Sequence, residues 1–181
     1  MRYLIGWQSQ NSNATDRKGM IMRENATVSS DISTRFLTIR TAIAEMQGEA
    51  TYIQGKLFHF DEAPSVRELL GVLVEKMNGA LWDARSEYQV ACEKLAAAPD
   101  DEELPNLEPT ISLNLLIAAL HDLMGDLTHA VEQLIAKGSE PLAALGLALV
   151  VSCGENLVKS FNSTKLAAQE LEELLTETKQ R

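Results

Sequence analysis

The feature that most constrains this chain is an apolar side chain that recurs every three or four positions through four successive segments. In residues 31–58 the intervals run 4-3-4-3-4-3-4, which is the period of an amphipathic helix with a narrow buried seam. The seam consists of Ile32, Phe36, Ile39, Ile43, Met46, Ala50, Ile53 and Leu57. Such a seam leaves water only by facing other helices, so this segment predicts one member of a helical bundle.

The second segment, residues 65–97, repeats the pattern and carries signals for both of its ends. Ser65 and Glu68 have the spacing of a capping box, in which the serine caps the amide of the glutamate and the carboxylate reaches back. Pro99 lies just past the expected end, where a helix does not readily continue. The buried stripe consists of Val66, Leu70, Leu73, Met77, Leu81, Ala84, Tyr88, Ala91 and Leu95.

The third and fourth segments, residues 110–137 and 139–178, predict a second helical hairpin. Gly138 suits the end of one helix and Ser139 the cap of the next, so the loop between them is short and the helices are antiparallel. The fourth segment is apolar nearly all round up to Cys153, which predicts a place at the centre of the bundle. The third seam consists of Leu113, Leu116, Leu120, Leu123, Leu127, Ala130 and Leu134.

Together these segments predict an all-α four-helix bundle of two antiparallel hairpins, 31–58 with 65–97 and 110–137 with 139–178. Gly154 and the cluster Asn162-Ser163-Thr164 place any kink or split of the last helix near 154–164. The bundle forms a single domain over 29–181. Residues 1–28 are polar and without a period, which predicts a flexible tail, and residues 99–109 read as an acidic crossover loop with three prolines.

Charge argues against several kinds of partner. The net charge is −10, and residues 49–108 alone hold thirteen acidic groups against five basic ones. Phosphate backbones and anionic membrane surfaces need clustered Lys and Arg, so nucleic acid and membranes are not expected partners. The apolar run in residues 1–7 is too short for a signal peptide, and the run in 142–153 is too short to span a bilayer. We therefore expect a cytoplasmic protein.

Residues typical of catalysis or metal binding are sparse. His121 and His129 lie on faces of their helix that point away from the leucine seam. The Glu-x-x-His pair that binds metals inside helical bundles does not occur in the sequence. There is no phosphate loop and no glycine-rich dinucleotide turn. Cys92 and Cys153 lie within expected helices, where reduced and partly buried thiols are the ordinary finding. We expect no catalytic residue, no metal ligand, no cofactor and no enzymatic activity.

Two features are candidates for partner binding. Trp82 lies off the seam of its helix, with Gly79 and Arg85 as neighbours one turn away, and tryptophan is enriched among interface hot spots. The alternative is that Trp82 packs against another part of the same chain. The acidic residues of the crossover, Asp100, Asp101, Glu102 and Glu103, could meet a basic partner, and their alternative role is a solvated linker.

These observations favour a non-enzymatic helical protein-interaction module, acting as an adaptor, regulator or inhibitor. Its partner is another protein or a second copy, with a homodimer expected because the seams are long for one small chain to cover. Two alternatives stay open. One is an acidic mimic of nucleic acid that blocks a basic site. The other is a small-ligand sensor with a pocket between helices, lined by Cys153, Tyr88 or a histidine.

Overall fold

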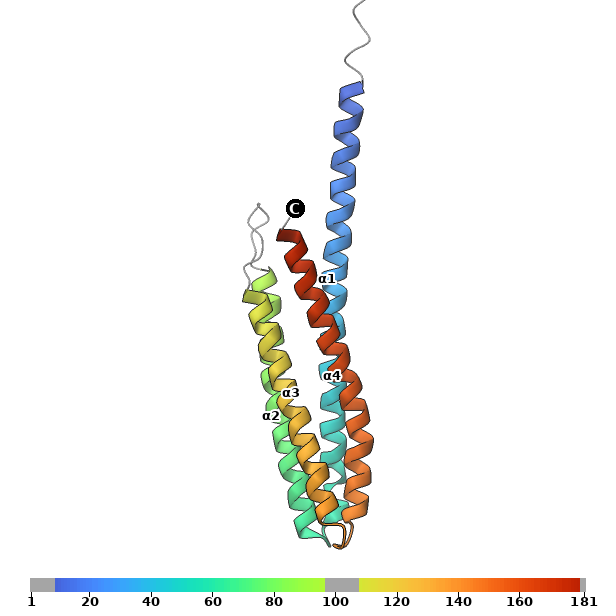
Figure 1. Ribbon diagram of the computed structural model, residues 1–181, viewed down its shortest axis with the longest axis vertical. Coiled ribbons are helices and arrows are strands. Elements are labelled where there is room, and N and C mark those ends of the chain that lie inside the picture. Colours follow the sequence, from blue (N-terminus) through green and yellow to red (C-terminus); the bar gives the residue numbers. More distant parts are fainter. Residues whose placement is uncertain (1–8, 97–107, 180–181) are drawn as a thin grey trace, which may run out of the picture.

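The computed structural model describes residues 9–96 and 108–179, and these form four long antiparallel helices (Figure 1). The helices are α1 (Ser9–Lys56), α2 (Pro64–Ala96), α3 (Glu108–Ala136) and α4 (Ala143–Lys179). One 3₁₀ turn, η1 (Leu57–Phe60), joins α1 to α2. The described residues include no strand, so the prediction of an all-α bundle is confirmed.

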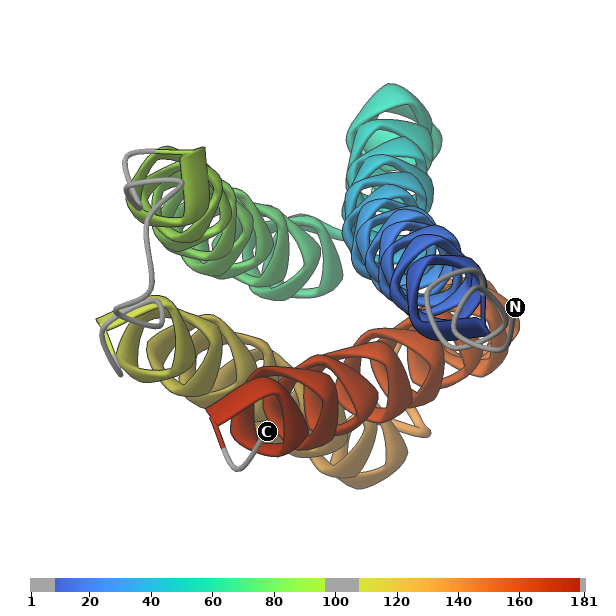
Figure 2. The same cartoon turned by 90° about the horizontal axis from the view of Figure 1, so that it is seen from above.

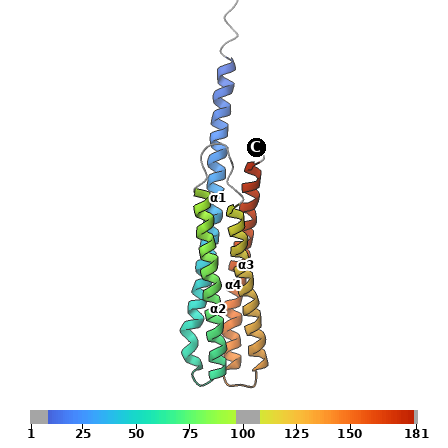
Figure 3. The same cartoon turned by 90° about the vertical axis from the view of Figure 1, so that its left-hand side faces the viewer.

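The four helices surround a common axis in the order α1, α2, α3, α4, as the view from above shows (Figure 2). The most extensively packed pairs are α2 with α3 and α1 with α4, so the ring is closed by contacts between the two hairpins as well as within them. Helices α1 and α3 lie diagonally opposite, and their backbones do not approach each other closely. The side view shows all four helices running nearly parallel to the long axis (Figure 3).

The predicted seams form the core. On α1 every seam residue from Phe36 to Ile53 is buried, and the flanking Ile32 and Leu57 are half-buried. On α3 the whole seam from Leu113 to Leu134 is buried. Because the largest fully buried side chains are aliphatic apart from Phe60, burial of leucine, isoleucine and methionine supplies most of the force that holds the ring together.

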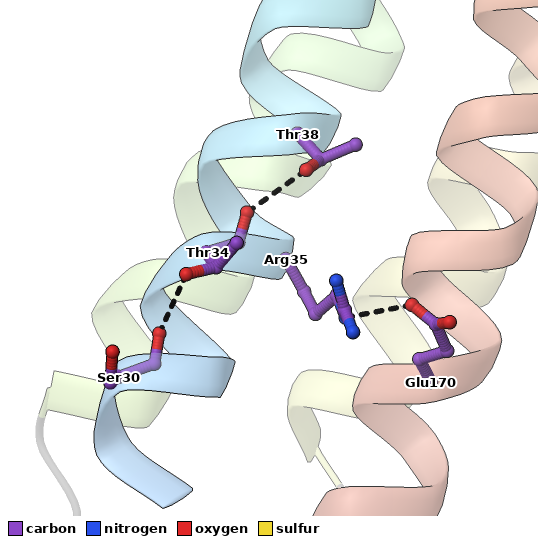
Figure 4. A network of polar contacts seen from close by, with 5 residues as sticks. All are labelled: Ser30, Thr34, Arg35, Thr38 and Glu170. Carbon is purple, nitrogen blue, oxygen red and sulfur yellow. Dashed lines mark hydrogen bonds and ion pairs between the residues drawn. The ribbon is translucent and has the colours of Figure 1, made fainter. Parts of the chain in front are cut away.

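Polar contacts fix which face of α4 meets α1. Ser160 Oγ on α4 donates to Glu45 Oε2 at 2.8 Å, and Asn156 Nδ2 donates to Glu49 Oε1 at 2.8 Å. Closer to the C-terminal end of α4, Arg35 Nε of α1 lies 2.7 Å from Glu170 Oε2 (Figure 4). The two groups form an ion pair, but their geometry is not that of a hydrogen bond. Because these contacts recur along the pair, a shift of one helix along the other would break all of them.

The start of α2 differs from the sequence prediction. The helix begins at Pro64, a position that suits proline because its missing N–H would have no partner there. The predicted capping box is wrong: Ser65 Oγ donates to Glu140 Oε2, and Lys137 Nζ donates to Glu140 Oε1 at 3.1 Å. These hydrogen bonds lower the pKa of Glu140, and the one from Ser65 has the larger effect. Ser65 therefore ties the start of α2 to the turn between α3 and α4.

Helix α4 also departs from prediction in its start and its place. It begins at Ala143 rather than residue 139, because Leu142 adopts a φ of 62°, a left-handed conformation that interrupts the helix. In that conformation the Leu142 side chain packs against the core. Nor is α4 central: it is one of four equivalent members of the ring, and its Leu145 and Val151 are exposed.

The expected weak point at 154–164 is an uninterrupted part of α4. Gly154 makes room for α3, since a Cβ added there would lie 3.2 Å from Leu127 Cδ2. The buried Thr164 donates to the Ser160 carbonyl at 2.8 Å. The small and polar residues in this stretch therefore serve contacts between and within helices, and the helix does not break.

The N-terminal segment is helical where the structure describes it. Within the segment predicted to be a flexible tail, residues 9–28 continue α1 back to Ser9, and this part extends past the other helices as a single helix (Figure 1). Adding a turn to an existing helix avoids the cost of nucleation, so the packed part of α1 can propagate outward. Residues 1–8 and most of the predicted crossover, up to residue 107, lie outside the described residues.

Two helical glycines offer a matched test of this packing. Gly125 is exposed, and a Cβ there meets nothing within 4 Å, so Gly125→Ala should raise the free energy of unfolding by about 1 kcal/mol. At Gly146 an added Cβ would lie 3.0 Å from Val66 Cγ1 and 3.2 Å from Leu134 Cδ2. Gly146→Ala should therefore lower the free energy of unfolding by about 1 kcal/mol, since overpacking outweighs the gain in helix propensity. Urea unfolding measures both, and equal stabilisation by the two substitutions would contradict the packing.

Candidate functional site

Trp82 is the most exposed large hydrophobic side chain in the described part of the chain, at 71%. Gly79, one turn earlier on α2, is exposed, and a Cβ added to it would meet nothing within 4 Å. No described helix therefore covers Trp82, and the alternative that it packs against the crossover or the start of the chain stays a prediction, because residues 1–8 and 97–107 lie outside the described residues. The indole stands on the outer face of α2 beside a shallow gap left by the glycine.

Arg85, one turn after Trp82, lines a groove of about 430 Å³ between α1 and α2. The structure thus brings Arg85 together with side chains of α1 that sequence reasoning did not select, Arg40 and Gln47 among them. The sequence around Arg40 and Gln47 gave no sign of a site, because the groove forms only where α1 packs against α2. The lining residues are Arg40, Ile43, Ala44, Gln47, Arg85, Tyr88, Gln89 and Cys92.

The groove is cationic in an acidic protein. None of its lining residues is acidic, whereas two are arginines. Neither Arg40 nor Arg85 has an acidic residue three or four positions away on its own helix. Within the described residues neither arginine forms an ion pair, although Arg35, Arg67, Lys76 and Lys137 all do. Two uncompensated guanidinium groups therefore face the same groove.

Tyr88 forms part of the wall and is held in place by an aromatic contact. Its ring meets Phe36 of α1 edge to face, with centroids 5.8 Å apart and an interplanar angle of 67°. The pKa of Tyr88 is raised to about 12, mainly by burial and to a smaller extent by its hydrogen bond with Cys92. Burial also raises the pKa of Cys92. Both groups are therefore neutral near pH 7, so the charge of the groove comes from its arginines.

Two other grooves in the described part of the chain have mixed charge. A groove of about 310 Å³ between α2 and α3 contains Leu69 and Val72 and is crossed by an ion pair between Lys76 Nζ and Asp126 Oδ1 at 2.5 Å. Another, of about 380 Å³ near the α1–α2 turn, contains Arg67 and Asp61, which pair at 3.1 Å. In each groove carboxylates already neutralise the cations. The α1–α2 groove differs from both.

The thiol of Cys153 is buried against α1. Burial, and then a hydrogen bond to Glu49, raise its pKa to about 12. The side chains of His121 and His129 are exposed, as their rows on the helix predicted. Over residues 9–96 and 108–179, no group of three or more His, Cys, Asp or Glu side chains could hold a metal ion. Asp100, Asp101, Glu102 and Glu103 lie outside the described residues.

The outer sides of α3 and α4 carry seven of the twelve exposed large hydrophobic side chains in the described chain. Windows in Pro109–Ala136 and Ala143–Glu177 reach mean hydropathies of 1.2 and 1.3, with 33% of each window buried. By length and composition both helices could cross a membrane. Core helices of soluble bundles meet the same criteria, so this is weak evidence for a membrane span.

Comparisons of the chain with protein-family models, with curated proteins and with solved structures found no match. The candidate site consequently stands on its own geometry: the exposed Trp82, the gap at Gly79 and the cationic groove that begins at Arg85.

The environment of the two cysteines predicts different thiol reactivity. At pH 8 Cys153 should react with an aromatic disulfide reagent more than about a hundredfold more slowly in the native protein than in urea, because the thiolate is the reactive form. Cys92, which is half-buried, should react before Cys153. Single-thiol variants, Cys92→Ser and Cys153→Ser, separate the two rates. A native Cys153 that reacts as fast as it does in urea would show that its surroundings are not closed.

Proposed function

We propose that this chain is a non-enzymatic helical protein-interaction module, and that a second copy of the chain is one of its partners. The observation that carries the proposal is the exposure of Trp82, at 71%, on a helix face with a polar surround. Asn78, Arg85 and Ser86 flank it and are exposed. A large aromatic anchor with a polar rim is the composition of an interface hot spot.

Gly79 supports self-association in particular. An exposed glycine within a helix costs about 1 kcal/mol relative to alanine, and no described side chain of this copy uses the space beside it. In a twofold dimer each surface meets its own copy, so the Trp82 of one copy can lie against the Gly79 of the other. Close approach at the glycine would offset its cost and cover the indole.

The exposed aliphatic residues of α3 and α4 are a weaker candidate for this interface. On α4 they are Leu145, Val151, Val158 and Leu166, spaced six to eight residues apart. Polar side chains, including Glu155 and Asn162, separate them. Aliphatic side chains scattered singly are common on protein surfaces, whereas an exposed tryptophan is not.

Sedimentation equilibrium at micromolar concentration tests the proposal with three variants. We expect the wild-type chain to be a dimer and Trp82→Ala to be a monomer. Gly79→Leu should also be a monomer, and because it replaces a helical glycine its loss of association cannot come from a weakened helix. Val158→Lys is the matched control on α4 and should stay dimeric.

Two outcomes of this experiment would overturn the assignment. A wild-type chain that stays monomeric at the highest concentrations would remove the second copy as a partner. A dimer that Val158→Lys dissociates while Trp82→Ala leaves it intact would place the interface on α4 instead of α2.

The hypothesis of nucleic-acid mimicry stays a prediction. It requires carboxylates gathered on one surface, yet two described carboxylates of the grooves, Asp61 and Asp126, are paired with cations. Mimicry would further require an association that weakens steeply with added salt.

A further inference from the structure

We propose that the groove between α1 and α2 binds a small organic anion through Arg40 and Arg85. The ligand class is a compact molecule that carries one or two carboxylate or phosphate groups. This site lies one turn from Trp82 but does not depend on the proposed interaction function, since a monomer contains the whole groove.

Charge is the first reason. A guanidinium group presents a planar fork of donors that matches the oxygens of a carboxylate or a phosphate. Arg40 and Arg85 stand on facing helices, line one groove and form no ion pair within the described residues. Elsewhere in the bundle, as at Arg67 with Asp61, cations beside a groove are neutralised by the chain itself. An anion from outside would supply the missing partner here.

The remaining lining residues suit the rest of such a ligand. Ile43 and Ala44 give the groove apolar surface for a carbon skeleton, while the amides of Gln47 and Gln89 can donate to further oxygens. The Tyr88 hydroxyl also belongs to the lining and is held by the contact with Phe36. About half of the groove surface is polar, and placed polar groups beside an apolar wall are what orient a small molecule in its site.

The size of the groove favours a small ligand over a segment of another protein. The groove has a volume of about 430 Å³, within the range of small-molecule pockets. Its walls run from Arg40 to Gln47 on α1 and from Arg85 to Cys92 on α2, which is a rise of about 10 Å along each helix. That length matches a molecule of a few carbon atoms and is too short for a docked helix of several turns.

Nuclear magnetic resonance of the full chain tests the site with two probes, inorganic phosphate and succinate. The side-chain Nε–H signals of Arg40 and Arg85 should shift and saturate with at least one probe, and the probe that binds names the ligand class. Arg40→Gln and Arg85→Gln should each weaken binding about tenfold or more, because each removes a charge-assisted hydrogen bond. Arg67→Gln, outside the groove, is the matched control and should leave the affinity unchanged.

A second variant keeps the test decisive if an arginine substitution disturbs the fold. Ala44 is exposed, so Ala44→Glu should fold normally while placing a carboxylate in the groove; it should abolish binding. Circular dichroism checks the helical content of every variant. The proposal is overturned if neither probe shifts the two arginine signals in a saturable way. It is also overturned if binding persists unchanged in Ala44→Glu or in both arginine variants.

Discussion

The structure depends on the exclusion of water from four apolar seams. Each seam is too narrow to be buried by its own helix, so four helices must meet around one axis before any seam is covered. Residues such as Ile39, Leu70, Leu120 and Leu157, which are all fully buried, then contribute their hydrophobic free energy together. Loss of one helix would expose the other three, which makes the ring a cooperative unit.

Polar groups determine how that ring is arranged. Apolar seams alone allow helices to slide, whereas Glu45 with Ser160 and Glu49 with Asn156 hold α1 against α4 at one register. Ser65 and Glu140 hold the start of α2 at the α3–α4 turn in the same way. The grooves between neighbouring helices follow from this arrangement. In two other grooves of the described residues, Lys76 pairs with Asp126 of the facing helix and Arg67 pairs with Asp61 of the nearby turn. The α1–α2 groove stands out because Arg40 and Arg85 form no ion pair within the described residues.

Sequence periodicity predicted the four packed helices and their buried faces, because burial is decided by which residues share a helix face. It did not predict the part of α1 before residue 31, which has no apolar period. It failed at positions whose role depends on a neighbouring helix. Ser65 had the spacing of a local cap but bonds Glu140, seventy-five residues away. Gly154 suggested a break but accommodates Leu127. Trp82 and Arg85 could be selected from α2 alone, whereas Arg40 became a candidate only when packing placed it across from them.

The order of the helices around the axis is the claim on which the core, the polar contacts and the grooves all depend. It can be tested by cross-linking with a short bis-maleimide in a chain carrying Cys92→Ser and Cys153→Ser. Glu49→Cys combined with Asn156→Cys places the reactive groups on adjacent helices, so an intramolecular cross-link should form rapidly. Glu49→Cys combined with Asp126→Cys places them on the diagonal helices α1 and α3, where none should form. Rapid cross-linking of the second pair without the first would contradict the ring.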